Sequence, residues 1–161
     1  MGEQSLIDRW ITRLSSDSQP GEDTKRDLLH RFQKLYEKEL VLMRELEAEA
    51  RHLPYPHLTE AALKIVEDKQ KDLQTIAGLI REFGGTPEAK TAEDHRAEPT
   101  GEFTRILALE NEIGEQLIDD ANWAEDLGLE QQAHLLMQLK EKHYGYQEAI
   151  ESLIMKINGA L

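Results

Sequence analysis

The chain has 161 residues, with 19 Lys and Arg against 32 Asp and Glu, and it contains no cysteine. The net charge of −13 argues against a nucleic-acid partner, because phosphate binding requires clustered basic side chains. The absence of cysteine excludes disulfides, thiolate metal sites and cysteine nucleophiles. Since no apolar run approaches the roughly 20 residues of a membrane span, we expect a cytoplasmic protein with neither a membrane nor a nucleic-acid partner.

Residues 1–22 are expected to form a short amphipathic helix and a linker. Over 5–14, apolar side chains recur at helical spacing behind Ser5, a suitable cap: Leu6, Ile7, Trp10, Ile11 and Leu14. Two roles are open for this helix. It can cover its own domain, or it can insert Trp10 into a partner.

Four longer segments follow, and each repeats apolar residues every three or four positions. They run from about 23 to 53, 59 to 83, 101 to 127 and 129 to 157. Gly84 and Gly85 are expected to end the second segment, and Gly128 to separate the third from the fourth. The pattern predicts one all-α domain over 23–161.

The lengths of the connections predict the topology. Segments 52–56 and 127–129 are short, whereas 84–101 is an 18-residue link rich in Gly, Pro and charge. The second helix would be roughly 37–40 Å long, and a link of this length can reach about 60 Å. Short, long and short connections predict two antiparallel hairpins joined by one crossover. The alternative is an up-down bundle with a disordered loop.

The acidic residues concentrate in the third helical segment. Residues 102–127 hold eight acidic side chains and one basic side chain, Arg105. This face is either solvated or a docking surface for a basic protein partner or for cations.

Three stretches resemble the ferritin-like superfamily. Residues 67–73 with 79–87 resemble the end of the second bundle helix in rubrerythrin-like proteins, and 107–112 resembles the third-helix glutamate region. Residues 124–129, with the apolar positions up to Leu139, resemble a stress-associated bacterial branch. The resemblance covers 23–157 and implies a ferritin-like four-helix bundle that forms a homodimer.

The resemblance also implies the position of a two-metal site. In that superfamily a Glu from each of helices one and three, and a Glu-x-x-His from each of helices two and four, hold the metals. Carboxylate oxygens and imidazole suit iron and manganese. In this chain the single-Glu positions fall on Glu39 and Glu110, and the paired motifs fall on Lys69-x-x-Asp72 and Lys140-x-x-His143.

Lysine stands where the superfamily has the glutamate of each Glu-x-x-His motif, and an ammonium has no lone pair with which to bind a metal. We therefore expect a former metal-site cluster made of Glu39, Lys69, Asp72, Glu110, Lys140 and His143. The lysines would neutralise the glutamates, because an unpaired buried charge is costly. The resulting hypothesis is a binding or structural module, stress-related by resemblance, that needs no cofactor and has no catalytic residue.

The alternative hypothesis is a metal-binding oxidoreductase or iron-handling protein. Iron or manganese would then be held by Glu39, Asp72, Glu110 and His143. Other interpretations also stay open: Lys69 and Lys140 can extend to water, and His143 can be a hydrogen-bonded core histidine. The register can also differ, so that the partial motifs are Glu67-x-x-Gln70 and Glu141-x-x-Tyr144. Glycines inside the helices, Gly78, Gly114 and Gly145, either allow close helix approach or leave a small pocket.

Overall fold

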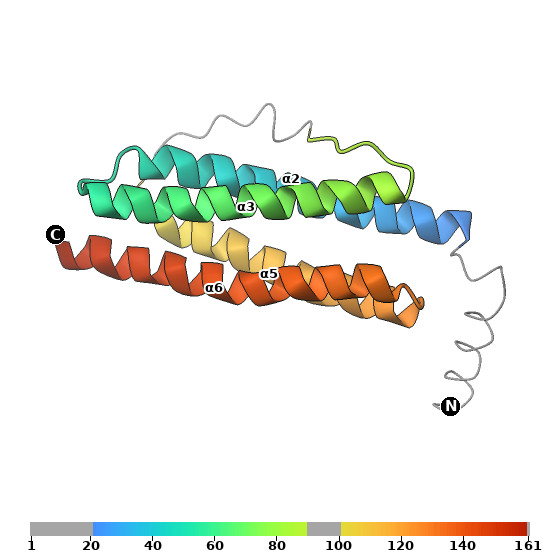
Figure 1. Cartoon of the computed structure of the whole chain (residues 1–161). Helices are drawn as coiled ribbons and strands as arrows, with labels where there is room; N and C mark the ends of the chain where they lie inside the picture. Colours follow the sequence, from blue (N-terminus) through green and yellow to red (C-terminus); the bar gives the residue numbers. More distant parts are fainter. Residues whose placement is uncertain (1–20, 90–100, 161) are drawn as a thin grey trace.

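The computed structural model describes residues 21–89 and 101–160, and this part of the chain consists of four α-helices (Figure 1). They are α2 (Glu22–Ala50), α3 (Pro56–Glu82), α5 (Phe103–Asp126) and α6 (Glu130–Ala160). The expected N-terminal helix with Trp10 lies outside the described residues, as do positions 90–100 of the expected crossover. None of the described helices is long and apolar enough to cross a membrane.

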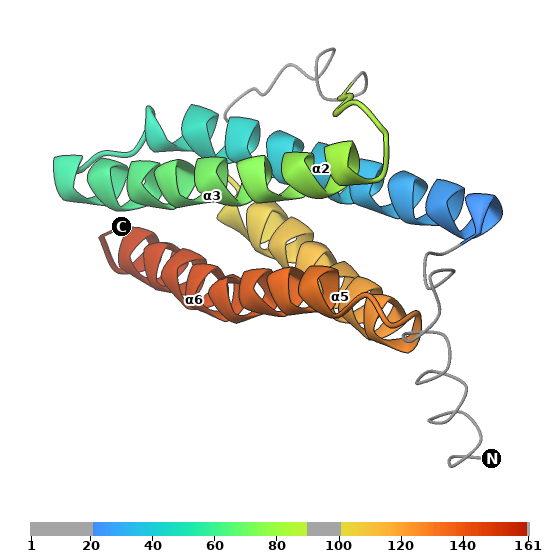
Figure 2. The same cartoon turned by 45° about the vertical axis from the view of Figure 1, so that its right-hand side comes forward.

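The helices form two antiparallel hairpins, α2–α3 and α5–α6, with α2 packed on α5 and α3 packed on α6 (Figures 1 and 2). The connection from α3 starts beside the N-terminal half of α2, where Gln33 hydrogen-bonds the backbone of Thr86 and Glu88. It ends at Gly101, whose N–H donates to Glu49 near the C-terminal end of α2. The described ends of the connection therefore lie beside opposite halves of α2, and the predicted order of short, long and short connections is confirmed.

Glycines in the left-handed conformation end α3 and α5. Gly84 has φ 84° and Gly128 has φ 77°, values that cost an L side chain energy. In each case the next residue donates to a carbonyl five positions back, from Gly85 to Ile80 and from Leu129 to Ala124. The predicted stops are therefore confirmed. The start of α3 lies at Pro56, earlier than expected, because proline suits the first turn of a helix, where its missing N–H has no partner.

The core is a set of apolar stripes from all four helices. It contains aliphatic and aromatic side chains such as Leu28, Phe32, Leu42, Ile76, Ile80, Ile113 and Leu136. Burying one such side chain stabilises the fold by about 1.5–3 kcal/mol. The same stripes also carry buried charged residues, and three of them, Glu39, Lys69 and Glu110, meet at the centre of the bundle.

A polar contact joins the two hairpins away from the centre. Arg31 of α2 lies 3.1 Å from the buried carboxylate of Asp120 on α5, and its guanidinium sits 4.6 Å from the centre of the Trp123 ring. Gln116 donates both to Asp120 and to the backbone carbonyl of Arg31. Burial raises the pKa of Asp120 although these hydrogen bonds oppose the shift.

Candidate functional site

A lysine ammonium lies between two carboxylates at the centre of the bundle. Lys69 Nζ is 2.9 Å from Glu39 Oε2 and 2.6 Å from Glu110 Oε2. The side chains of Lys69, Glu39 and Glu110 are 0%, 4% and 0% exposed. Because Glu39 is on α2, Lys69 on α3 and Glu110 on α5, one ammonium connects three helices.

Helical periodicity places these charges inside. Each occupies a position three or four residues from buried aliphatic neighbours, as Glu110 does between Ile106 and Ile113. Residues at this spacing share one helix face, so the face that buries the aliphatic side chains also buries the charge. Inside the bundle the charges must pair, since water no longer stabilises them.

The imidazole of His143 contacts the same glutamate from α6. Its Nδ1–H donates to Glu110 Oε1 at 2.9 Å, so Glu110 is shared between Lys69 and His143. A side chain at Gly114 would overlap the His143 ring, whereas Gly78 and Gly145 face open space. Of Gly78, Gly114 and Gly145, Gly114 is therefore the one that permits close packing of α5 on α6.

Asp72 is held by two residues of α6 that were not among the predicted site residues, Tyr146 and Lys142. Tyr146 donates its hydroxyl hydrogen to Asp72 Oδ2 at 2.5 Å, and Lys142 lies 2.8 Å from Oδ1. The ring of Tyr146 also lies 4.4 Å from Lys69 Nζ, a cation–π contact. Tyr146 thus joins the Asp72 contacts to the central ion pairs. A signal for it existed, because Tyr146 follows His143 by three residues on the buried face, where a phenol needs a partner.

The expected place of Lys140 in the central cluster is wrong. Its ammonium lies 4.0 Å from Glu141 and 5.9 Å from the centre of the Tyr144 ring. Successive helical residues are about 100° apart, so Lys140 and Lys142 lie on opposite edges of the buried face of α6. The edge carrying Lys142 faces α3, and this is why Lys142 rather than Lys140 reaches Asp72.

Burial and pairing change the proton affinities of the cluster. Burial raises the pKa of Glu39 to about 7, although the charge on Lys69 opposes the change. Burial works against the charge of Lys69, but attraction from Glu39 and Glu110 exceeds that effect and raises its pKa. Burial and the neighbouring Asp72 also raise the pKa of Tyr146, so its phenol stays protonated and can act as a donor.

The side chains that would have to hold a pair of metal ions are paired with other side chains of the protein. The Lys69 ammonium is within ion-pair distance of both glutamates that would have to approach a metal. Both oxygens of Asp72 already accept from α6. Over 21–89 and 101–160, no three His, Asp or Glu side chains converge in a way that could hold a metal ion.

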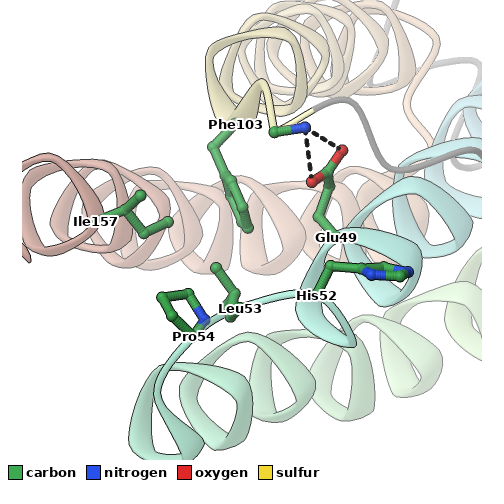
Figure 3. A pocket seen from close by; sticks show the side chains of 7 residues that line it. Glu49, His52, Leu53, Pro54, Phe103 and Ile157 are labelled. Atoms are coloured by element: carbon green, nitrogen blue, oxygen red, sulfur yellow. Dashed lines mark hydrogen bonds between the residues drawn. The ribbon is translucent and has the colours of Figure 1, made fainter. Parts of the chain in front are cut away.

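A separate cavity of about 290 Å³ lies at the end of the bundle where α2 meets α3 (Figure 3). Its lining is mostly apolar: Leu53, Pro54, Phe103 and Ile157, with Glu49, His52 and Gly101. The Glu49 carboxylate accepts the Gly101 N–H at 3.1 Å and 3.2 Å, so it fixes the residue that precedes α5 by two positions. This cavity shares none of its lining residues with the charge cluster.

Comparison with solved structures identifies the class of fold. Bacterioferritin from Desulfovibrio desulfuricans, described with a di-iron site in different catalytic states, matches with a TM-score of 0.74. The match covers 86% of this chain and 84% of that one at 16% sequence identity. No family model and no curated protein matches the sequence. The chain therefore has the ferritin-like four-helix-bundle fold, and the predicted fold class is confirmed.

Proposed function

We propose that this ferritin-like bundle uses Lys69 in place of a metal at its centre and acts as a binding or structural module. The observation that carries the proposal is the position of the Lys69 ammonium between Glu39 and Glu110. In a metal site the cation compensates the buried carboxylates. Here the Lys69 ammonium compensates the carboxylates, so the site needs neither a metal ion nor a cofactor.

The charges around the centre support this proposal. Three buried carboxylates, Glu39, Asp72 and Glu110, face two ammonium groups, Lys69 and Lys142. A proton on the glutamate whose pKa is raised to about 7 would bring the set to neutrality near physiological pH. A dication added to this set would have to displace the Lys69 ammonium from the two glutamates, and the ammonium would then lie unpaired in a low-dielectric interior.

Metal analysis of the purified protein tests the proposal. The protein is expressed with added iron and manganese, and its metal content is measured by mass spectrometry. We expect no tightly bound metal in the native chain. We expect metal in the Lys69→Glu variant, because a carboxylate would then replace the ammonium beside Glu39, Glu110 and His143.

Lys140→Glu is the matched control, because the side chain of Lys140 lies at the edge of α6, away from the two glutamates. It should gain no metal. Near-stoichiometric metal in the native chain would contradict the proposal. If that metal also supported a ferroxidase activity lost in His143→Ala, the chain would be an iron-handling protein. A folded Lys69→Glu variant without metal affinity would show that the remaining donors do not converge on one position.

The expected homodimer, and the expected basic partner of the acidic helix, stay predictions. Glu112, Glu115 and Asp119 are exposed on α5. Light scattering across a range of protein concentrations distinguishes a monomer from a dimer. Binding of a basic protein that is lost when the charges on α5 are reversed would assign the interface with that partner to this helix.

A further inference from the structure

Two apolar side chains are exposed together on the outer face of the α5–α6 hairpin. Ile118 is 37% exposed and Met137 is 40% exposed. Each lies roughly two helical turns from the tight turn between α5 and α6, so the antiparallel hairpin brings them to one level. Tyr144 continues the exposed row along α6.

The contacts of neighbouring residues settle which way this pair points. On α5, Asp120 faces α2 through Arg31, and Ile118 is rotated by about 160° from Asp120. On α6, Lys142 faces α3 through Asp72, and Met137 is rotated by about 140° from Lys142. Ile118 and Met137 therefore lie on the side of the hairpin that faces away from α2 and α3.

On its α5 side, this apolar pair is bordered by negative charge. Glu115 and Asp119 lie next to Ile118 on the solvent side of α5, and both are exposed. A segment that covers the pair would be stabilised by an apolar face with positive charge along one edge. A second copy of the same surface would bring like charges together, which opposes self-association through this face.

Residues 5–14, outside the described part of the chain, have the required pattern. In a helix over 5–14, the spacing would put Leu6, Ile7, Trp10, Ile11 and Leu14 on one face. Arg9 and Arg13 are four residues apart, so they would lie along one edge of that face. The segment therefore offers apolar side chains to Ile118 and Met137 and two cations to the acids beside them.

The length of the chain permits this contact. The first turn of α2 lies at the same end of the bundle as the α5–α6 turn (Figure 1), and Arg31 of α2 contacts Asp120 and Trp123 of α5. Residues 15–21 can span at most about 25 Å, whereas a helix is about 10–12 Å across. We propose that helix 5–14 of the same chain docks over Ile118 and Met137, with Arg9 and Arg13 beside Glu115 and Asp119.

Tryptophan fluorescence of the full chain tests the proposal. The chain has 2 Trp, so Trp123→Phe leaves Trp10 as the single reporter. We expect blue-shifted Trp10 emission that acrylamide quenches weakly and that does not change with protein concentration. Adding Ile118→Asp and Met137→Asp should shift the emission to the red and increase quenching, while the bundle stays folded because both positions are exposed.

Leu63→Asp is the matched control, because Leu63 is also 40% exposed but lies on α3. It should leave the Trp10 signal unchanged. A second pair of variants tests the charges: Arg9→Glu with Arg13→Glu should increase quenching, and adding Glu115→Lys with Asp119→Lys should restore protection.

Three results would overturn the proposal. The first is fully solvent-exposed emission from Trp10 in the Trp123→Phe chain. The second is an equal effect of Leu63→Asp and of the Ile118→Asp and Met137→Asp pair. The third is protection that appears only with rising concentration and a doubled mass, because the docked helix would then come from another copy.

Discussion

Replacing Lys69 by methionine removes the central ammonium while keeping a side chain of similar length. Glu39 and Glu110 would then be buried without the cation that lies 2.9 Å and 2.6 Å from them. Breaking a buried ion pair by removing one partner costs about 3–5 kcal/mol, because an uncompensated charge stays in the interior. All three side chains are at most 4% exposed, so solvent can screen little of this cost.

The expected loss is measurable by thermal and urea denaturation followed by helical circular dichroism. For a chain of this size, about 3–5 kcal/mol corresponds to a melting temperature lower by about 6–20 °C. The loss should be largest above neutral pH. Below it, Glu39 takes up a proton, since burial raises its pKa to about 7, and one of the uncompensated charges disappears.

Lys64→Met is the matched control on the same helix. Lys64 is 63% exposed and pairs with Asp68 at 3.3 Å, and such surface pairs contribute about 0–1 kcal/mol. Adding Glu39→Gln and Glu110→Gln to Lys69→Met should recover part of the lost stability, because the buried charges are then gone. If Lys69→Met and Lys64→Met cost the same, the ammonium does not bridge the two glutamates and the reasoning is wrong.

Three further perturbations have defined outcomes. In the native chain, the free energy of unfolding should fall by about 3 kcal/mol as pH rises from about 4.5 to about 7, because the folded state binds a proton on Glu39 more tightly than the unfolded state does. Glu39→Gln should flatten this pH dependence, and an unchanged dependence would assign the effect to another group. Gly114→Ala should destabilise the fold by about 1–3 kcal/mol, because the new methyl group forces the His143 ring to move. Gly78→Ala is the control: its methyl group meets nothing within 4 Å, so it should stabilise the fold by about 0.5–1 kcal/mol. Equal effects of the two variants in urea denaturation would refute the close approach of α5 and α6 at Gly114. Arg31→Ala should lower the free energy of unfolding by about 1–3 kcal/mol, because it removes the cation that pairs with the buried Asp120 carboxylate. No change in stability would show that this contact does not help to join the hairpins.

Periodicity was sufficient to predict the helices and the inward position of several charges. Glu39, Lys69 and Glu110 occupy stripe positions among aliphatic residues, and a side chain on that face has no other place to lie. The glycine stops at Gly84 and Gly128 were predictable because a left-handed residue after a helix strongly favours glycine. These features depend on neighbours within a few residues, which the sequence contains directly.

The expectation for Lys140 was wrong because the sequence does not show which edge of α6 faces α3. Lys140 and Lys142 lie on opposite edges of one face, and only the packing of α3 on α6 selects Lys142 as the partner of Asp72. Tyr146 was missed for a related reason. Its pairing with Asp72 and its ring contact with Lys69 join residues far apart in the chain.

The sequence alone determined the four amphipathic helices, their order and the burial of charge at the centre, because each follows from local spacing and loop length. How those charges pair depends on the packing of the helices, which local spacing does not specify. The distances that place one ammonium between Glu39 and Glu110, and one imidazole against Gly114, depend on how the two hairpins rotate and approach each other. A buried charge is stable only beside its partner, so the packing of the hairpins decides which groups form the site.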